Sequence, residues 1–273
     1  MKEAAHVAAR EMRIGFRNPW AYSFMALFCL FSLSLLLLPT TGKGDGYTAA
    51  TGSLLNLILY LLPLMTLLLG SFSLTSEKED GSWELLATYP LGTFAFLAGK
   101  FVGMAAVLLT IVAFGFGVTG VMGALGGHPL DAGTFGLFFA FSAGLMVLFL
   151  AVALVVGTVA GNRWQALTIS VAVWFFLIVG WPTLLIAGLG LLPYPWVKPA
   201  LLALTAANPA ELVRLFVVVK LGGGSVLGPD YYRWANGMES PYGTAVFLLI
   251  CAAWVAIAAA LSYAFWERRR SRG

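Results

Sequence analysis

Long apolar segments separated by short polar stretches dominate the pattern of this chain. Six of these segments are long enough to cross a bilayer, since a helical crossing takes about 20 apolar residues. The predicted spans cover residues 21–38, 54–74, 98–124, 135–160, 166–192 and 244–265. We therefore expect an all-α polytopic membrane protein with six transmembrane helices, built as a single transmembrane domain over residues 1–273.

The composition supports this fold class. Of the 273 residues, 60% are hydrophobic and only 10% are charged, whereas soluble domains carry about 25% charged residues. Both cysteines, Cys29 and Cys251, lie inside apolar spans, so a disulfide framework is not expected. They have no nearby histidine and form no predicted metal site.

The distribution of basic residues predicts the orientation. Six spans put both termini on one side of the membrane, and basic residues gather on the cytoplasmic side. Eleven of them fall on the side of the termini: Lys2, Arg10, Arg13, Arg17, Lys78, Lys100, Arg163, Arg268, Arg269, Arg270 and Arg272. Five fall on the other side: Lys43, Lys198, Arg214, Lys220 and Arg233. The sequence thus predicts a multi-pass protein of the cell (inner, cytoplasmic) membrane with cytoplasmic N- and C-termini.

Residues 1–20 have the pattern of an amphipathic helix. A basic stripe at helical spacing lies beside an apolar stripe, and Asn18-Pro19 interrupts the helix before the first span. The basic stripe comprises Lys2, His6, Arg10, Arg13 and Arg17, and the apolar stripe comprises Ala5, Ala8, Ala9, Met12 and Phe16. This pattern predicts a helix lying in the cytoplasmic membrane interface, near lipid headgroups.

The fifth span, 166–192, is irregular. It contains Gly180-Trp181-Pro182, and Pro182 removes one helical hydrogen bond. We expect a kinked or broken helix toward the outer face. Small residues at helical spacing, Gly99/Gly103 and Ala153/Gly157/Gly161, predict close helix contacts.

The long connection 193–243 is expected to be extracytoplasmic and helical in part. Asn208 is a good N-cap, Pro209 a good first residue, and Lys220 falls in the last turn before three glycines. Glu211 and Arg214 would each cost about 2.5–3.5 kcal/mol at the centre of a span. The sequence therefore favours a helix on the membrane surface over a seventh span. Asn208, Glu211 and Arg214 are candidate contacts for an outer partner, the alternative for Arg214 being a pair with Glu211 or a lipid phosphate.

Chemistry-bearing residues are missing from the predicted spans. All twelve acidic residues lie outside them, and His6 and His128 are the only histidines. Ion-coupled transporters normally need ionisable groups in the membrane, and a hydrolase needs a base or metal ligands. Six residues separate Gly92 from Gly99-Lys100, where a phosphate-binding loop needs four. We predict no catalytic residue, metal site or cofactor in this chain, and an energy source in another chain.

The segment 75–93, between the second and third spans, is the most polar interruption on the predicted cytoplasmic side. Ser82, or alternatively Asp80, can cap a short helix over 83–89 that Pro90 ends. Exposed Trp and Leu side chains flanked by acids have the composition of a docking hot spot. The alternative is a solvated loop in which Trp83 dips into the headgroups.

The stretch from Glu77 to Gly103 resembles the signature of type-2 ABC-transporter permeases. The matching residues are Glu77-Lys78-Glu79, Gly81-Ser82, Glu84-Leu85-Leu86, Pro90 and Gly99-Lys100. Ser82 stands where the family commonly has threonine, and Trp83 where it commonly has an aliphatic residue. The resemblance implies a coupling helix that docks on a cytoplasmic ATPase. The docking set is then Glu77, Lys78, Glu79, Asp80, Gly81, Ser82, Trp83, Glu84, Leu85 and Leu86.

Within the family, the arrangement is most similar to permeases of nitrous-oxide-reductase maturation transporters. This implies a homodimer, two ATPase subunits that bind ATP and magnesium, and an extracytoplasmic β-helical partner serving copper-site assembly. Any copper is expected to be handled by a partner. Two other functions stay open: a type-2 exporter permease for a lipid, drug or glycan, and a non-transporting membrane scaffold.

Overall fold

The computed structural model describes residues 2–34, 47–81, 92–125, 132–224 and 232–270. Within these ranges every regular element is helical and there is no strand. The elements are α1 (Lys2–Gly15), α2 (Pro19–Ser34), α3 (Ala49–Glu79), α5 (Thr93–Leu125), α6 (Ala132–Val159), α7 (Arg163–Trp174), the π-helical turn η2 (Phe175–Gly180), α8 (Trp181–Gly190), α9 (Tyr194–Ala207), α10 (Pro209–Lys220), α11 (Tyr232–Glu239) and α12 (Pro241–Arg270).

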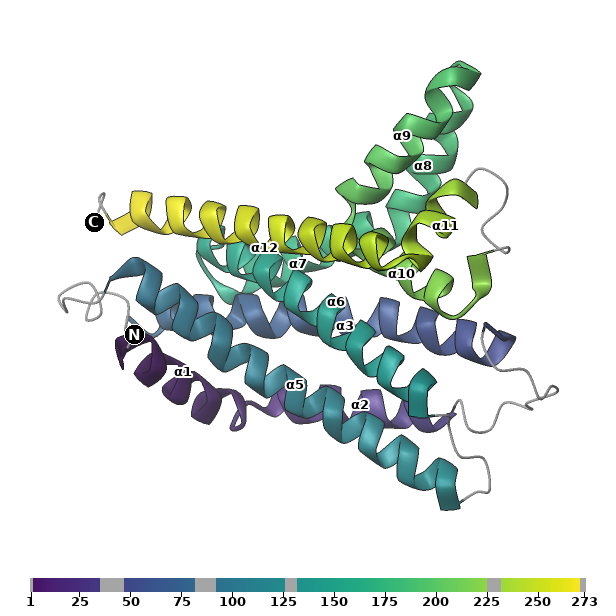
Figure 1. Ribbon diagram of the computed structural model, residues 1–273. Helices are drawn as coiled ribbons and strands as arrows, with labels where there is room; N and C mark the ends of the chain where they lie inside the picture. The colour runs from purple at the N-terminus through teal and green to yellow at the C-terminus, as the bar shows by residue number, and fades with distance from the viewer. Residues whose placement is uncertain (1, 35–46, 82–91, 126–131, 225–231, 271–273) are drawn as a thin grey trace.

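The core of the bundle is the contact between α3 and α6, two of its most buried helices. Small residues let them approach closely: a Cβ on Gly70 would lie 2.7 Å from the Cβ of Ala153, and one on Gly157 would lie 3.0 Å from Leu74. The expected close contact at Ala153 and Gly157 is therefore confirmed. Helices α1, α2 and α5 cover one side of this core and α12 another, and both chain termini lie at one end of the bundle (Figure 1). We call this the terminal end.

Five of the six predicted spans are long apolar helices in the structure. Within the described residues, helices that could cross a membrane run over Thr51–Glu79, Thr93–Leu125, Ala132–Val159, Arg163–Gly190 and Pro241–Arg268. The first predicted span begins as α2, an apolar helix that the structure describes as far as Ser34. The rest of that span, residues 35–38, lies outside the described residues, so its crossing stays a prediction. The protein is a multi-pass membrane protein.

Helix α1 lies along α5 rather than apart from the bundle. A Cβ on Gly99 would lie 2.7 Å from the backbone oxygen of Ala4, and one on Gly103 would lie 2.6 Å from that of Ala8. These two glycines therefore form a close contact as expected, and its partner is the N-terminal helix. The buried face of α1 carries Ala8, Glu11 and Gly15.

That face is rotated from the apolar stripe that the sequence suggested. Ala5, Ala9 and Phe16, three members of the stripe, are exposed, whereas Glu11 is buried. The pattern alone favoured the more apolar face, but the shape of α5 decided the contact because its glycines admit the backbone of α1. The exposed apolar residues therefore lie on the outside of the bundle. A helix in the membrane interface needs apolar residues there to contact lipid.

The fifth predicted span is kinked but continuous. The N–H of Trp181 donates to the carbonyl of Phe176, five residues earlier, which is the π-helical pattern. The next donor in this pattern would be Pro182, which has no N–H, so the carbonyl of Leu177 needs another partner. Asn208 provides it, since its Nδ2 donates to this oxygen at 2.7 Å. Beyond the π turn, α8 and α9 leave the bundle side by side (Figure 1).

The described parts of the long connection between the fifth and sixth predicted spans are largely helical, as expected, and α10 is buried within the bundle. All of its residues except Arg214 and Lys220 are buried, and it packs against α6, α11, α9 and α12. Helices α9 and α10 meet at an angle of 107° and together are apolar enough to count as one broken span or re-entrant pair. The burial of α10 against these helices was not anticipated, because the sequence argument weighed Glu211 and Arg214 as separate charges facing lipid; its position at the membrane surface stays a prediction.

Candidate functional site at the terminal end of the bundle

The predicted docking set is divided between described and undescribed residues. Helix α3 continues through Glu77, Lys78 and Glu79, and Asp80 is its C-cap. Gly81 follows with a φ of 68°, a left-handed conformation that favours glycine. Ser82, Trp83, Glu84, Leu85 and Leu86 lie outside the described residues, as does the predicted helix at 83–89. The structure therefore describes the two points from which this segment leaves and re-enters the bundle.

A buried cluster of charges surrounds Lys100. Its side chain is 1% exposed, and its Nζ lies 2.8 Å from Glu11 Oε2 and 3.0 Å from Glu77 Oε1. The ammonium also donates to the backbone oxygen of Ser73 at 2.8 Å, and the hydroxyl of Ser73 donates to Glu11. Arg10 Nη1 lies 3.0 Å from Glu77 Oε1. Two carboxylates thus face two cations, which is the balance that buried charges require.

Lys78 joins a different pair of helices. Its Nζ donates to the backbone oxygens of Gly157 at 2.7 Å, Thr158 at 3.0 Å and Ala160 at 2.7 Å. These carbonyls belong to the C-terminal end of α6, where oxygens lack partners within their own helix and the helix dipole is negative. The ammonium also lies 5.6 Å from the centre of the Trp266 ring of α12. Lys78 therefore caps α6 and contacts α12.

Glu79 connects α3 to the start of α7. Its Oε2 lies 3.1 Å from Arg163 Nε, and its Oε1 accepts the backbone N–H of Arg163 at 2.8 Å. Asn162 is the N-cap of α7 and accepts the backbone N–H of Gln165. A carboxylate at a helix N-terminus is favoured by the helix dipole. The carboxylate of Glu79 and the amide of Asn162 thus satisfy different N–H groups of the same helix end.

The three consecutive charges therefore reach three different neighbours. Successive residues of an α-helix point about 100° apart, and α3 is surrounded by other helices at its terminal end. Glu77 is directed to α1 and α5, Lys78 to α6 and α12, and Glu79 to α7. As a consequence, Glu77 is 5% exposed and faces the interior of the protomer. Its carboxylate lies between Lys100 and Arg10, and its docking on an ATPase stays a prediction.

The other end of the undescribed segment is anchored as well. Thr93 Oγ1, at the start of α5, donates to Glu267 Oε2 of α12 at 2.6 Å. Two residues of the same helices, Phe96 and Trp266, stack with ring centres 5.1 Å apart. The residues on both sides of the segment 82–91 are thus bonded to neighbouring helices. Before it, Glu77 contacts α1 and Lys78 contacts α6; after it, Thr93 contacts α12.

The predicted outer contacts lie elsewhere, at the start of α10. Asn208 caps that helix by accepting the N–H of Ala210 at 2.9 Å. Arg214 Nη2 donates to Glu211 Oε1 at 2.5 Å, so the alternative of an Arg214–Glu211 pair is confirmed. Glu211 is 7% exposed and Asn208 is 1% exposed. In the protomer, Asn208 and Glu211 serve the packing of α10 and of the kinked span.

The sequence reasoning missed the cluster around Lys100. It counted Glu11 and Arg10 as interfacial residues and placed Lys100 at the edge of a span. One signal was available, since Glu11 shares a helical face with the small residues Ala4, Ala8 and Gly15. Among the described residues, no group of three or more His, Cys, Asp or Glu side chains could hold a metal ion.

The sequence matches the family model for "ABC-2 family transporter protein" over residues 5–270. Two curated relatives are similar along nearly their whole length. One is "Probable ABC transporter permease protein NosY" of Stutzerimonas stutzeri, 31% identical, with 98% of this chain and 99% of the relative covered. The protein of the same name in Pseudomonas aeruginosa is also 31% identical, with 96% of this chain and 97% of the relative covered.

Proposed function

This chain belongs to the ABC-2 transporter family, as a permease, and we propose that the segment 75–93 receives the movement of a cytoplasmic ATPase and passes it to the membrane helices. The observation that carries this proposal is the anchoring of both ends of the segment. A displacement of residues 82–91 acts on α3 and α5 through the backbone, on α7 through Glu79 and on α12 through Thr93. Helices α3 and α5 are apolar enough to cross the membrane, so the displacement reaches its other side.

The charge cluster makes the terminal ends of several helices move together. Breaking one partner of a buried ion pair costs about 3–5 kcal/mol, which is more than a thermal fluctuation supplies. Lys100 and Glu77 therefore keep α1, α3 and α5 in register, while Lys78 attaches α6. We infer that ATP-driven motion displaces these ends as a block rather than bending one helix alone.

These contacts divide the predicted docking set into residues that hold the bundle and residues that bind the ATPase. Glu77, Lys78 and Glu79 hold the bundle, so the grip on the ATPase falls to the residues that follow them. Trp83 and Leu86 supply apolar anchors, and Asp80, which is exposed, and Glu84 supply charge. The chain has no competing nucleotide site at Gly99-Lys100, because Lys100 is committed to Glu11 and Glu77 inside α5.

The finer role proposed is that of a permease in nitrous-oxide-reductase maturation. The two relatives named NosY and the likeness of the 77–103 motif support it. We propose a homodimer with two ATPase subunits, which bind ATP and magnesium, on the cytoplasmic side. The excess of basic residues near the termini favours that side for the terminal end. An extracytoplasmic β-helical partner would contact the segment 193–243 and handle copper.

Two alternatives make different predictions. A lipid, drug or glycan exporter would show ATPase stimulation by its substrate. A membrane scaffold would keep its function when the ATPase is deleted. Loss of function on ATPase deletion, without stimulation by amphiphilic compounds, would favour the maturation role.

The direct test of docking is Trp83→Ala, measured as co-purification with the candidate ATPase and as ATP turnover of the complex. We expect at least a tenfold loss of bound ATPase, as for a hot-spot residue. Trp164→Ala is the matched control, because Trp164 is 78% exposed at the same end of the bundle but outside the segment. Equal ATPase retention by the two variants would refute the docking role.

A further inference from the structure

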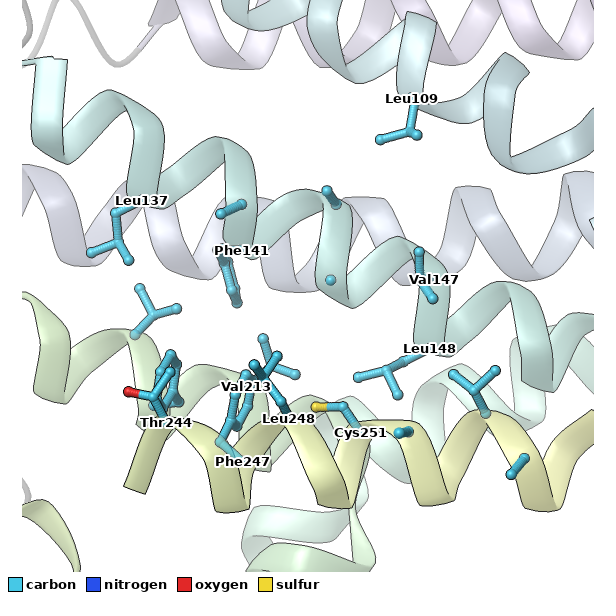
Figure 2. Close-up of a pocket in the computed structure, with 18 of the residues that line it drawn as sticks. Leu109, Leu137, Phe141, Val147, Leu148, Val213, Thr244, Phe247, Leu248 and Cys251 are labelled. Atoms are coloured by element: carbon cyan, nitrogen blue, oxygen red, sulfur yellow. The ribbon is translucent and has the colours of Figure 1, made fainter. Parts of the chain in front are cut away.

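A long apolar groove lies between α6 and α12, far from the charge cluster. Its volume is about 720 Å³, and α5 and α10 form its floor. Figure 2 shows Phe141 and Leu148 of α6 pointing toward α12, whose Phe247 and Cys251 line the opposite wall. Apart from the hydroxyl of Thr244 and the thiol of Cys251, the lining side chains are hydrocarbon. Water would gain few hydrogen bonds there, so the chemistry of the groove selects a hydrocarbon ligand.

The length and width of the groove restrict the class of ligand further. Along α12 the groove extends from Thr244 to Ala259, which is about 22 Å at 1.5 Å per residue. The groove volume is the space open to the centre of a water-sized sphere, so its mean cross-section over that length, about 32 Å², corresponds to a groove roughly 9 Å across between atom surfaces. An α-helix with its side chains is about 10–12 Å wide. The groove is therefore too narrow for a helix of a second copy, whereas an extended alkyl chain fits its width.

The direction of the groove matches that of lipid chains. Helix α12 is one of those long and apolar enough to cross the membrane, so a groove along it runs roughly parallel to the bilayer normal. Its length exceeds half of the hydrocarbon core, which is about 30 Å thick. One end, near Thr244, lies at the start of α12 and so at the membrane interface opposite the terminal end. A headgroup can remain there while the chain enters the protein.

Small residues keep the groove open. A Cβ added to Gly144 of α6 would meet no atom within 4 Å, whereas one added to Gly157 of the same helix would meet Leu74 at 3.0 Å. The helix is thus in close contact with α3 at one position and separated from α12 at the other. On α12, Ala252 and Ala256 line the facing wall.

We propose that this groove binds one acyl chain of a membrane phospholipid and that the chain completes the packing of α12 against α6. Little of the apolar stretch of α12 is buried by the chain itself, so a bound acyl chain adds to the apolar surface that this helix buries. Since Trp266 and Glu267 of α12 hold the start of α5, the lipid also steadies that anchor. This inference concerns lipid binding by the protomer and does not depend on ATPase docking.

The test uses photo-crosslinking in nanodiscs of phosphatidylethanolamine and phosphatidylglycerol that contain a trace of phospholipid with a diazirine at mid-chain. Peptide mass spectrometry after illumination locates the labels. We expect them to concentrate on the lining residues Ala140, Gly144 and Leu148 of α6 and Leu248, Ala252 and Val255 of α12, at least fivefold above Leu249 and Ile257. These two residues lie on the same helix and are 69% and 57% exposed, so they measure labelling by bulk lipid.

Filling the groove provides the matched comparison. Gly144→Phe places a ring in it and should reduce groove labelling at least fivefold. Gly136→Phe, on the same helix and equally open but outside the groove, should leave it unchanged. A melting curve in detergent checks both variants: added phosphatidylglycerol should raise the melting temperature of the wild type and of Gly136→Phe, and not that of Gly144→Phe.

Three results would overturn the proposal. The first is groove labelling no stronger than that of Leu249 and Ile257. The second is equal groove labelling in Gly144→Phe and Gly136→Phe. The third is an unlabelled groove together with a crosslink between Cys251 and a second copy, which would identify the groove as a protein interface.

Discussion

Replacing Lys100 by methionine tests the physical basis of the cluster most directly. Methionine keeps an unbranched apolar side chain of similar length but removes the charge that Glu11 and Glu77 share. Lys100 is 1% exposed and Glu11 is 2% exposed, so solvent cannot replace the lost partner. Glu77 retains Arg10, which lies 3.0 Å away, whereas within the described part of the chain Glu11 retains the hydroxyl of Ser73 alone.

Removing one member of a buried pair costs about 3–5 kcal/mol. For a chain of this size, 1 kcal/mol lowers the melting temperature by roughly 2–4 °C. We therefore expect Lys100→Met to lower the apparent melting temperature by roughly 6–20 °C, read by intrinsic tryptophan fluorescence in detergent at a fixed heating rate. Lys198→Met, the same substitution at an exposed lysine of α9, should change it by less than about 2 °C.

The double variant Glu11→Gln/Lys100→Met tests whether the instability of Lys100→Met comes from an unpaired buried carboxylate. It removes both members of the closest pair and leaves Glu77 with Arg10, so no carboxylate is buried without a cation. It should be more stable than Lys100→Met alone, because the two effects are strongly non-additive. A double variant that is less stable by the sum of the two single effects, or a Lys100→Met protein as stable as wild type, would refute the account of the cluster.

Three further predictions concern neighbouring contacts. Gly103→Leu should detach α1 from α5, because its Cβ would meet the backbone oxygen of Ala8 at 2.6 Å, and limited proteolysis should then cut α1 faster. The control Gly117→Leu, whose Cβ would meet no atom within 4 Å, should leave the cleavage rate unchanged. Lys78→Met should leave the end of α6 without its cap, measured as at least tenfold faster hydrogen exchange at 157–161, and unchanged exchange would contradict the capping role. Asn208→Ser should keep an oxygen that caps the helix but lose the donor to the π turn, costing about 1–2 kcal/mol, while Asn208→Ala should lose both and cost more; equal melting temperatures would contradict this.

The sequence anticipated most of the helical architecture because hydrophobic periodicity is a local property. Five apolar helices lie where long apolar runs predicted them, and Asn208, Pro209 and Lys220 mark the ends of α10 as capping rules require. The kink of the fifth span was likewise predicted from Pro182. Each of these features depends on residues within one or two helical turns.

The environment of the charges could not be predicted in the same way. Hydropathy treats Glu211 and Arg214 as separate costs and therefore placed α10 on a surface. In the structure they pair with each other, and α10 is buried against α6. The same additive reasoning placed Lys100 at the edge of a span, although its partners Glu11 and Glu77 neutralise it inside the bundle.

The sequence by itself determined the class of protein, the positions of its apolar helices and the polar segment that joins two of them. It also determined that Glu77, Lys78 and Glu79 occupy successive positions there. Only the tertiary structure decided what each of them touches, because Lys78 bonds to carbonyls some 80 residues away and Lys100 to a carboxylate 89 residues away. Helical spacing fixes the direction of a side chain relative to its own helix, whereas its partner depends on which helix packs on that side.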